Sequence, residues 1–585
     1  SNNVIFISSY SKNLNINNLE LIGVKAILPI LPEYKISPEL HNGACPDHAL
    51  EDGIAKLKII IYDNVSLVNC KKQLANFGVI ENIDNIDNIV YLKIPLIKLH
   101  ELASIDFVSF IEPIDEKDKI ENHTSRTLIR SNVLNSNYPA GRKYTGDGVG
   151  VVMRDDGLIS GSIWGVHPDK KGRVDESKCF GCTTSNGDSD HGDHVSGTIM
   201  GAGNVDPKAK GMADGAFLYT MSSNNNNFDS IPSLYLSGDI LITSSSLGAT
   251  CNGGYSSLSN KLDKQVRDFP SLLHVYSAGN SGNQNCSYGA GSGWGNITGG
   301  HKQAKNLITV GRLTEDGNIW NTSSRGPATD GRIKPELCAK GHQVYSTADP
   351  GNANGYGAPP WTSPSTYVSV SGVQGMYMTI GGTSMACPAV SGTLALLHEA
   401  YRDLNGNQNA PSALLKCLLL NTADDIGNPG PDFTHGYGEV NAFKAIKALE
   451  QGRYFSGSIS QGNNNNHTIT VPTGVSEIKV MVYWHDKEAS PSASTALVND
   501  IDIQLTTPAG VPYNPWVLDP TPNVANLTAN ATRDFDGLNN MEQVTLNGGG
   551  LYNVLTGSFI PYDLSSGNYT LNVNGWSVPD GPQEY

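Results

Sequence analysis

Five short, strongly apolar segments between residues 148 and 311 constrain the fold of this chain more than any other feature of its sequence. Their Val, Ile and Leu residues run almost continuously instead of alternating with polar ones, which is typical of strands covered on both faces. Long helices are predicted at 383–404 and 412–424. Such strands alternating with helices predict an α/β fold, a doubly wound parallel sheet. The predicted strands are 148–153, 215–221, 239–246, 272–279 and 306–311.

The region before this sheet predicts a small separate domain. Because the chain has 585 residues, about twice what one core usually holds, we expect two to four domains. Strands at 57–63, 88–95 and 106–113 alternate with helices at 66–78 and 96–105. This β-α-β-α-β order predicts an open-faced α+β sheet with helices on one side. The charged segment 115–126 is expected to be an exposed linker.

The region after about residue 452 has a different pattern. Short segments at 477–484, 499–505, 542–546 and 568–573 alternate apolar and polar residues, with Pro, Gly and Asn between them. This pattern predicts an antiparallel sandwich or jelly roll. The sequence therefore predicts three domains, at 1–122, 123–450 and 451–585.

Charge and hydropathy exclude several classes of function. The net charge of −16 argues against binding to nucleic acid or to an anionic membrane surface, and it suits calcium. No apolar run reaches the ~18 residues of a membrane span. The chain starts SNNVIFISS, without a basic start or an apolar core, so we expect that a secretion signal has been removed.

The nine cysteines are an odd number, so at least one is free or paired between chains. Cys179 and Cys182 form CFGC, but the second pair that a zinc site needs does not follow. Cys251 and Cys286 lie in polar loops and are expected to pair in an oxidising compartment. Three others are predicted to be buried thiols: Cys338, Cys387 and Cys417.

Four polar motifs of the middle region carry the chemistry. They read VVMRDDG (151–157), HGDHVSG (191–197), SAGNSG (277–282) and GTSMACP (382–388). Each alone has an ordinary interpretation as a turn, a helix start or a helix cap. Together they place an Asp at the end of a strand, a His at the start of a helix, an Asn after a strand and a Ser at the start of a long helix. The order Asp, His, Ser is that of subtilisin.

With these motifs the chain resembles the subtilase family, whose corresponding motifs read HGTHVAG and GTSMATPHVAG. The resemblance implies a serine peptidase in which Ser384 is the nucleophile and His191 the general base. It also implies that Asn280 and the Ser384 backbone N–H stabilise the oxyanion. His194, three residues further along the helix, is expected to be structural.

Two aspartates compete for the third catalytic position. Subtilases usually show an aliphatic residue, Asp, Ser or Thr, then Gly, and this chain reads Arg154, Asp155, Asp156, Gly157. Counting back from the glycine, Asp155 takes the catalytic place and Asp156 replaces the hydroxyl residue. Arg154 and Asp193 are further departures, and we expect the extra charges to pair across the site.

Substrate is expected to bind as an added antiparallel strand. Because such pairing uses the backbone groups of the substrate and not its side chains, it implies broad specificity. The segment at 222–230 departs from common subtilases. The residues predicted to bind substrate are Ser246, Leu247, Gly248, Ser277, Ala278 and Gly279.

The flanking regions also resemble parts of subtilases. By its size and place, the N-terminal region is similar to a propeptide that assists folding and inhibits the enzyme intramolecularly; the alternative is an unrelated domain. The C-terminal region resembles the jelly roll of certain bacterial alkaline subtilases, and we expect the natural protein to continue past GPQEY or to have lost a tail. Calcium is expected there, against the alternative of solvated carboxylates. Its predicted ligands are Asp500, Asp502, Asn540 and Glu542.

The sequence thus predicts a secreted subtilisin-like serine endopeptidase of broad specificity that hydrolyses protein and peptide substrates and is present as a zymogen. Two alternatives remain open. One is a kexin-like processing protease specific for paired basic residues, which needs acidic residues in its pockets. The other is a catalytically silent subtilase fold that serves binding.

Overall fold

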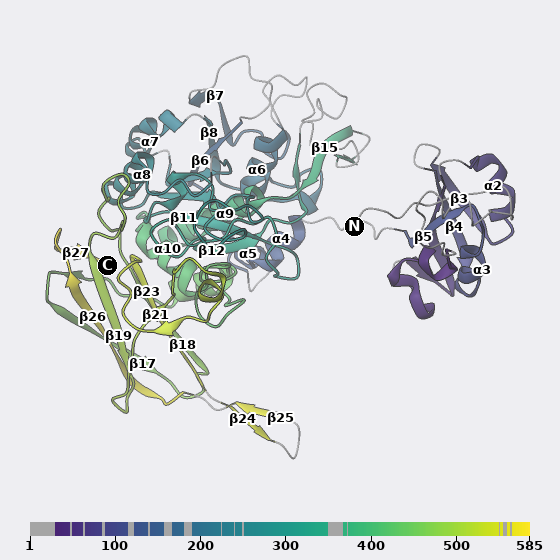
Figure 1. The fold of residues 1–585 in the computed structure, drawn as a ribbon. Coiled ribbons are helices and arrows are strands. Elements are labelled where there is room, and N and C mark those ends of the chain that lie inside the picture. The colour runs from purple at the N-terminus through teal and green to yellow at the C-terminus, as the bar shows by residue number, and fades with distance from the viewer. Residues whose placement is uncertain are drawn as a thin grey trace. The chain divides into compact units, whose positions relative to one another are not determined.

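The computed structural model divides into two compact units, Ser1–Lys119 and Ile120–Tyr585 (Figure 1). Each is considered by itself. The residues that the structure describes are 30–46, 49–62, 65–84, 88–114, 122–137, 141–156, 167–180, 190–223, 225–238, 240–248, 251–348, 367–370, 373–548, 550–553, 558–561 and 564–585.

In its described residues the first unit holds a five-stranded antiparallel sheet and the α-helices α2 and α3. The order of these elements is β1 (Leu50–Glu51), β2 (Ile54–Ile61), α2 (Leu67–Leu74), β3 (Val79–Asp84), β4 (Ile89–Pro95), α3 (Leu99–Ala103) and β5 (Val108–Pro113). Residues of β2 and β4 alternate between buried and half-buried, so one face of the sheet packs on the helices, with Leu74 and Leu102 in the shared core. The prediction missed β3, whose sequence VIENID is too polar to be recognised as a strand.

A parallel sheet of seven strands forms the centre of the second unit. Its strand order is β12-β11-β10-β9-β6-β8-β7, and every neighbouring pair is parallel. The α/β prediction is confirmed, and all five predicted strands are present. Their bounds are β6 (Gly150–Asp155), β8 (Phe217–Ser222), β9 (Ile242–Ser245), β10 (Leu273–Ser277) and β11 (Ile308–Leu313).

Five strands of the α/β region were not predicted. In the parallel sheet these are β7 (Val174–Phe180), which reads VDESKCF, and β12 (Leu337–Lys340), which has only four residues. Neither carries a long apolar run. The other three, β13 (Val344–Thr347), β14 (Tyr367–Val370) and β15 (Val373–Ile380), form a small antiparallel sheet.

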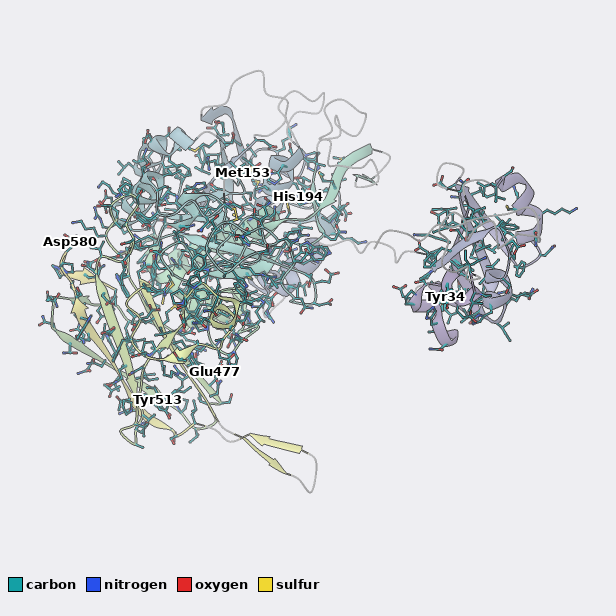
Figure 2. The ribbon with its side chains drawn as sticks, viewed as in Figure 1. Tyr34, Met153, His194, Glu477, Tyr513 and Asp580 are labelled. Carbon is teal, nitrogen blue, oxygen red and sulfur yellow. A yellow bond between two sulfur atoms is a disulfide. The ribbon has the colours of Figure 1, made fainter. Side chains whose placement is uncertain are left out.

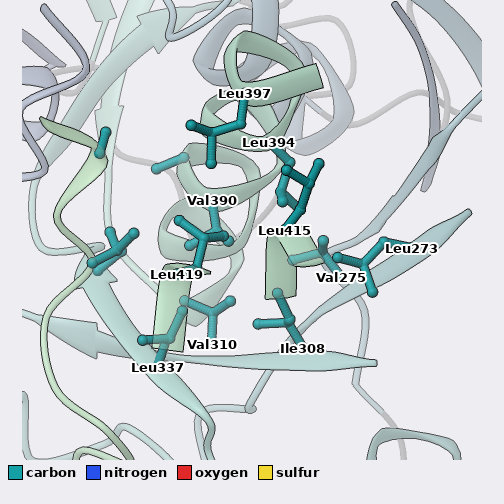
Figure 3. Packing of buried hydrophobic residues seen from close by; sticks show 14 of the residues in the cluster. Leu273, Val275, Ile308, Val310, Leu337, Val390, Leu394, Leu397, Leu415 and Leu419 are labelled. Atoms are coloured by element: carbon teal, nitrogen blue, oxygen red, sulfur yellow. The ribbon is translucent and has the colours of Figure 1, made fainter. Parts of the chain in front are cut away.

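Both faces of the parallel sheet are covered, as the continuous apolar runs predicted. On β6, Val151 and Met153 belong to one buried cluster and Val152 to another. The first cluster surrounds α9 (Thr383–Leu404) and α10 (Ser412–Asn421), where Val390 and Leu394 lie over Val275 and Val310 of the sheet (Figure 3). The second lies against α7 (Ile231–Leu236) and α8 (Ser257–Asp268).

After α11 (Ala442–Glu450) the chain forms antiparallel strands. Four of them make one sheet in the order β17-β26-β19-β20, and β18 pairs with β23 (Figure 1). Met481, Tyr483 and Met541 from β18 and β23 belong to the same buried cluster as α9 and α10, so this β region shares a core with the α/β region. The bounds are β17 (Asn464–Val471), β18 (Glu477–Tyr483), β19 (Asp500–Thr506), β20 (Pro512–Tyr513), β23 (Met541–Asn547) and β26 (Gly567–Ser577).

A buried ion pair joins the two regions. The Lys305 ammonium, just before β11, pairs with Asp486, and neither side chain is exposed. Asp486 also accepts hydrogen bonds from the backbone N–H groups of Val498 and Asn499, both at 2.8 Å. The neighbouring Asn306 amide donates to the Asp486 carbonyl at 2.8 Å. We call Lys305, Asn306 and Asp486 the interdomain clamp.

A disulfide joins Cys251 and Cys286, as predicted. Cys338 and Cys387 are buried thiols, whereas Cys417 is only half-buried. Gly181 and Cys182 of the CFGC motif lie outside the described residues. Among the helices that the structure describes, none is long and apolar enough to cross a membrane.

Candidate active site

Three elements of the α/β region carry the predicted catalytic residues. Asp155 is the last residue of β6, His191 lies in the first turn of α6 (Asp190–Met200), and Ser384 is the second residue of α9. Asn280 follows β10. The ends of parallel strands and the starts of the helices that follow lie at the same edge of such a sheet, so the fold gathers these residues at one place.

His191 is paired with Asp155. Its Nδ1 lies 2.7 Å from Asp155 Oδ1, and the carboxylate is fully buried while the imidazole is 26% exposed. Although burial favours the neutral imidazole, the charge of Asp155 and the hydrogen bond to it raise the pKa of His191 to about 9. An imidazole held in this way donates Nδ1–H to the carboxylate and leaves Nε2 to act as a base.

Asp156 takes a different position. Its Oδ1 accepts a hydrogen bond from the Gly192 backbone N–H at 2.8 Å. Burial, followed by the charge of Asp155, raises the pKa of Asp156 to about 8. Asp156 therefore caps the start of α6, while Asp155 contacts the imidazole directly. Gly157, from which the position of the catalytic aspartate was counted, lies outside the described residues.

Asp155, Asp156 and His191 also satisfy the geometry of a metal site, because each offers a ligand atom and these atoms lie within 4.8 Å of one another. The Asp–His pair of a serine peptidase requires the same closeness, and the 2.7 Å hydrogen bond from Nδ1 already uses one of these ligand atoms.

The extra charges near the site have partners that the sequence pattern did not indicate. Asp193 forms a buried ion pair with Lys170. The Arg154 guanidinium donates to the Ser223 carbonyl and lies 5.1 Å from the centre of the Phe228 ring. The expected pairing of the extra charges with one another stays a prediction.

His194, visible on α6 in Figure 2, is buried. Its Nε2 lies 2.7 Å from the Val344 carbonyl, and burial lowers its pKa to about 3. The ring therefore stays neutral and bridges α6 to β13.

Ser384 and Asn280 border one small space. The Asn280 Oδ1 accepts hydrogen bonds from the Thr383 backbone N–H at 3.0 Å and from its hydroxyl at 3.1 Å. These two bonds fix the orientation of the Asn280 amide. A Cβ added to Gly382 would lie 3.4 Å from the amide nitrogen Nδ2 of Asn280 and 3.6 Å from the backbone nitrogen of Ser384. Two donors thus face a position that only glycine leaves open, at the N-terminus of a 22-residue helix.

The predicted substrate-binding residues lie next to Ser384. The Ser384 hydroxyl donates to the Ser246 carbonyl at 3.0 Å, and the Ser246 hydroxyl donates to the Ser384 carbonyl at 2.8 Å. Leu247 is half-buried and Gly248 is exposed. On the other side, the Gly279 N–H donates to the Thr383 hydroxyl at 3.1 Å. Ser277 and Ala278 are buried at the end of β10.

The predicted calcium ligands are only partly brought together. Burial and then the charges of Asp502 and Asp536 raise the pKa of Asp500 to about 7, and one oxygen of Asp500 is buried without a hydrogen-bond partner. Burial and then Asp536 raise the pKa of Asp502 to about 6. In contrast, both Glu542 oxygens accept backbone N–H groups. The amide nitrogen of Asn540 donates to Trp484 and Asn306.

Sequence reasoning missed several residues that complete these sites. Thr383 orients the Asn280 amide, Lys170 neutralises Asp193, and Asp536 adds a carboxylate beside Asp500 and Asp502. A serine helix that begins with Gly-Thr-Ser carries a signal for Thr383. The other two partners lie 23 and 36 residues from the groups that they contact, and no local pattern indicates them.

Comparison with known proteins identifies the family. The model of the subtilase family matches residues 146–438, which is half of the chain. Subtilisin DY of Bacillus licheniformis is 27% identical over 298 residues, which cover 50% of this chain and 90% of that protein. Serine protease AprX of Bacillus subtilis is 30% identical over 154 residues, or 24% of this chain and 30% of that protein.

A third relative is the serine protease/ABC transporter B family protein tagA of Dictyostelium discoideum, 28% identical over 203 residues. That alignment covers 31% of this chain and 11% of the relative, so this chain spans only a small part of that protein. The family match coincides with the parallel sheet and includes all four predicted catalytic residues. The chain therefore belongs to the subtilase family, the subtilisin-like serine peptidases.

Proposed function

We propose that the chain is a serine endopeptidase that cleaves peptide bonds through an acyl-enzyme. The observation that carries this proposal is the 2.7 Å contact between His191 Nδ1 and Asp155, on the same sheet edge as Ser384. His191 Nε2 takes the hydroxyl proton as Ser384 Oγ attacks the substrate carbonyl carbon. The Ser384 hydroxyl first turns away from the Ser246 carbonyl, its partner in the free enzyme.

The negative charge of the tetrahedral intermediate falls on the former carbonyl oxygen. The Asn280 amide and the Ser384 N–H are placed to donate to it. When the intermediate collapses, His191 returns the proton to the leaving amine and an ester to Ser384 remains. Water, deprotonated by His191, then hydrolyses the ester and restores the serine hydroxyl.

A covalent probe tests this proposal. An alkyl fluorophosphonate should label Ser384 of the intact chain, with loss of fluoride, because it reacts only with a serine hydroxyl activated by a base. Ser384→Ala should not be labelled, while Ser391→Ala, which alters a buried serine of the same helix, should be. Peptide mapping identifies the labelled residue. If the intact and the propeptide-free chains both resist labelling, the protein belongs to the catalytically silent class.

The first unit is proposed to be the propeptide, with the chain as a zymogen. Its separation from the rest near Lys119 supports this, as does its place directly before the catalytic region. Intact mass and N-terminal sequencing check it in the same preparations. Cleavage between 115 and 130 that occurs in the wild type but not in Ser384→Ala is the expected result.

Secretion is proposed as well, supported by the Cys251–Cys286 disulfide.

Specificity is proposed to be broad at most substrate positions, because the segments next to Ser384 offer mainly backbone groups to an extended peptide. A kexin-like preference for paired basic residues needs carboxylates beside the substrate. The charged group 3.5 Å from Ser277 Oγ is instead the Lys302 ammonium, which favours the broad class.

We propose that calcium binds the carboxylates of Asp500 and Asp502, within the predicted C-terminal jelly roll. The like charges that raise the pKa of Asp500 and the unpartnered Asp500 oxygen support a cation there. When bound, calcium would neutralise these charges at neutral pH.

Calcium should therefore stabilise the chain. At about 100 times its Kd, a ligand that binds only the folded state adds ~2.7 kcal/mol to the free energy of unfolding. Thermal unfolding at pH 8 in chelator and in excess calcium measures this, and Asp500→Asn should remove most of the difference. Glu584→Gln, at an exposed site, should keep it. Equal Tm values in chelator and calcium would contradict the proposal.

Without calcium, the raised pKa of Asp500 should make the free energy of unfolding fall as pH rises from 4 to 7.

A further inference from the structure

Lys302 is a fully buried lysine, and within the described part of the chain its ammonium donates its hydrogen bonds to hydroxyl groups. It lies in the short 3-10 helix Gly300–Gln303 that precedes β11. Its Nζ donates to Thr298 Oγ1 at 2.8 Å and lies 3.5 Å from Ser277 Oγ. Burial lowers the pKa of Lys302 to about 7; Cys387 opposes this shift and Arg154 adds to it. A buried charge without an opposite charge is costly, so its retention needs a reason.

Three other buried lysines of the second unit show the usual solution. Lys170, Lys305 and Lys334 each form an ion pair, with Asp193, Asp486 and Glu336. Within the described part of the chain, no carboxylate lies within 4.0 Å of Lys302 Nζ, the limit that defines those pairs. Lys302 therefore differs from them in having no resident anion.

Thr298 connects the ammonium to the segments beside Ser384. Thr298 Oγ1, which accepts its hydrogen bond, would lie 3.3 Å from a Cβ on Gly248 and 2.3 Å from a Cβ on Gly279. These two glycines end the segments predicted to bind substrate on either side of Ser384. The Thr298 side chain therefore packs directly against both glycines, at a distance that a Cβ on Gly279 would not allow.

The two segments flank the position of one substrate side chain. The residue whose carbonyl carbon bonds to Ser384 is called P1. Ser246 and Gly279 both contact the first turn of α9, through Ser384 and Thr383 respectively. A substrate strand held along 246–248 would place P1 beside Ser384 and direct its side chain between Gly248 and Gly279, toward Thr298.

We propose that Lys302 makes this protease prefer an acidic residue, Asp or Glu, at P1. The inference rests on the proposed function and specifies its substrate class. The Thr298 hydroxyl, which in the free enzyme donates to the Ala278 carbonyl at 3.3 Å, turns to donate to the P1 carboxylate, while the Lys302 ammonium donates to the same hydroxyl oxygen and supplies the opposite charge. A fixed charge at the base of the P1 pocket is how serine proteases select a P1 residue of opposite charge. The main-chain contacts leave the other positions broad.

A matched substrate series tests the proposal. Six peptides of one sequence, differing only in Glu, Gln, Asp, Asn, Leu or Lys at P1, are compared by kcat/KM using the mature wild-type enzyme. Glu should exceed Gln, and Asp should exceed Asn, by at least about tenfold, with Lys the poorest. In Lys302→Met the Glu to Gln ratio should fall to about one. The Thr298→Val variant, which loses the hydroxyl but keeps the lysine, should lower the same ratio.

The controls separate this inference from the proposed function. Lys264→Met alters an exposed lysine of α8 and should keep the wild-type ratio. Fluorophosphonate labelling of Ser384 is measured for every variant. A wild type that is neither labelled nor active overturns the proposed function. A labelled, active wild type that cleaves after Gln as well as after Glu overturns the role of Lys302 alone. If Lys302→Met does not fold, the wild-type series and Thr298→Val still decide.

Discussion

Replacing Asp155 with asparagine should lower kcat about 10⁴-fold while leaving the fold intact. The amide keeps the size of the side chain but removes the charge that selects the productive imidazole tautomer and stabilises the imidazolium. Asp155 is the residue concerned because its Oδ1 lies 2.7 Å from His191 Nδ1. Steady-state kinetics on a peptide substrate measures the loss, and circular dichroism checks the fold.

Asp156→Ser is the matched variant, and it restores the residue type usual in the family. It should mainly change the pH dependence. With the pKa of His191 at about 9, the neutral base forms only in alkaline solution, so kcat/KM should rise with pH up to about 9. The Asp156 charge raises the pKa of His191, so its removal should move the rise to lower pH. A 10⁴-fold loss in Asp156→Ser with little loss in Asp155→Asn would exchange the two roles.

Breaking the interdomain clamp should have the largest effect on stability. Lys305→Met leaves the Asp486 carboxylate buried without its cation, which costs about 3–5 kcal/mol of unfolding free energy in comparable buried pairs. Urea denaturation followed by intrinsic fluorescence measures the change. The loss should be severe because the pair has no exposed surface from which water can replace the lysine.

The exposed pair Lys264–Asp268 provides the comparison. It lies on one face of α8 at i, i+4 spacing, with both side chains more than a third exposed. Lys264→Met should change stability by only ~0.3–0.5 kcal/mol. A loss in Lys305→Met as small as this would mean that the clamp contributes little, and that the apolar core shared by the two regions is sufficient.

The sheet could be predicted wherever its strands are buried on both faces. Segments such as 150–155 and 308–313 are mostly apolar and fully buried, since helices cover both sides. At the edge of the sheet a strand need not be buried in this way, and the continuous apolar run is absent. Val174–Phe180 lies at this edge and carries four polar residues. The site could be predicted because Asp155, His191, Asn280 and Ser384 each stand in a distinctive local motif.

Long-range pairing of charges could not be predicted. Asp193 in the catalytic helix was recognised as unusual, but its partner Lys170 belongs to a segment without any pattern of its own. Lys302 in GGHKQAKN resembles a solvated turn residue. Only the fold reveals that its ammonium is buried behind Thr298, because the neighbours that bury it come from β10 and α9.

The interdomain clamp has a consequence for how such proteins can evolve or be shortened. Lys302 and Lys305 stand three residues apart, one hydrogen-bonded to Thr298 and the other fixed to the β region. The segment that shapes selectivity is therefore anchored by a part of the chain more than 180 residues further on. The catalytic and β regions are not interchangeable modules: a chain ended at Glu450 would lose Asp486 and, with it, the anchor that holds this segment in place.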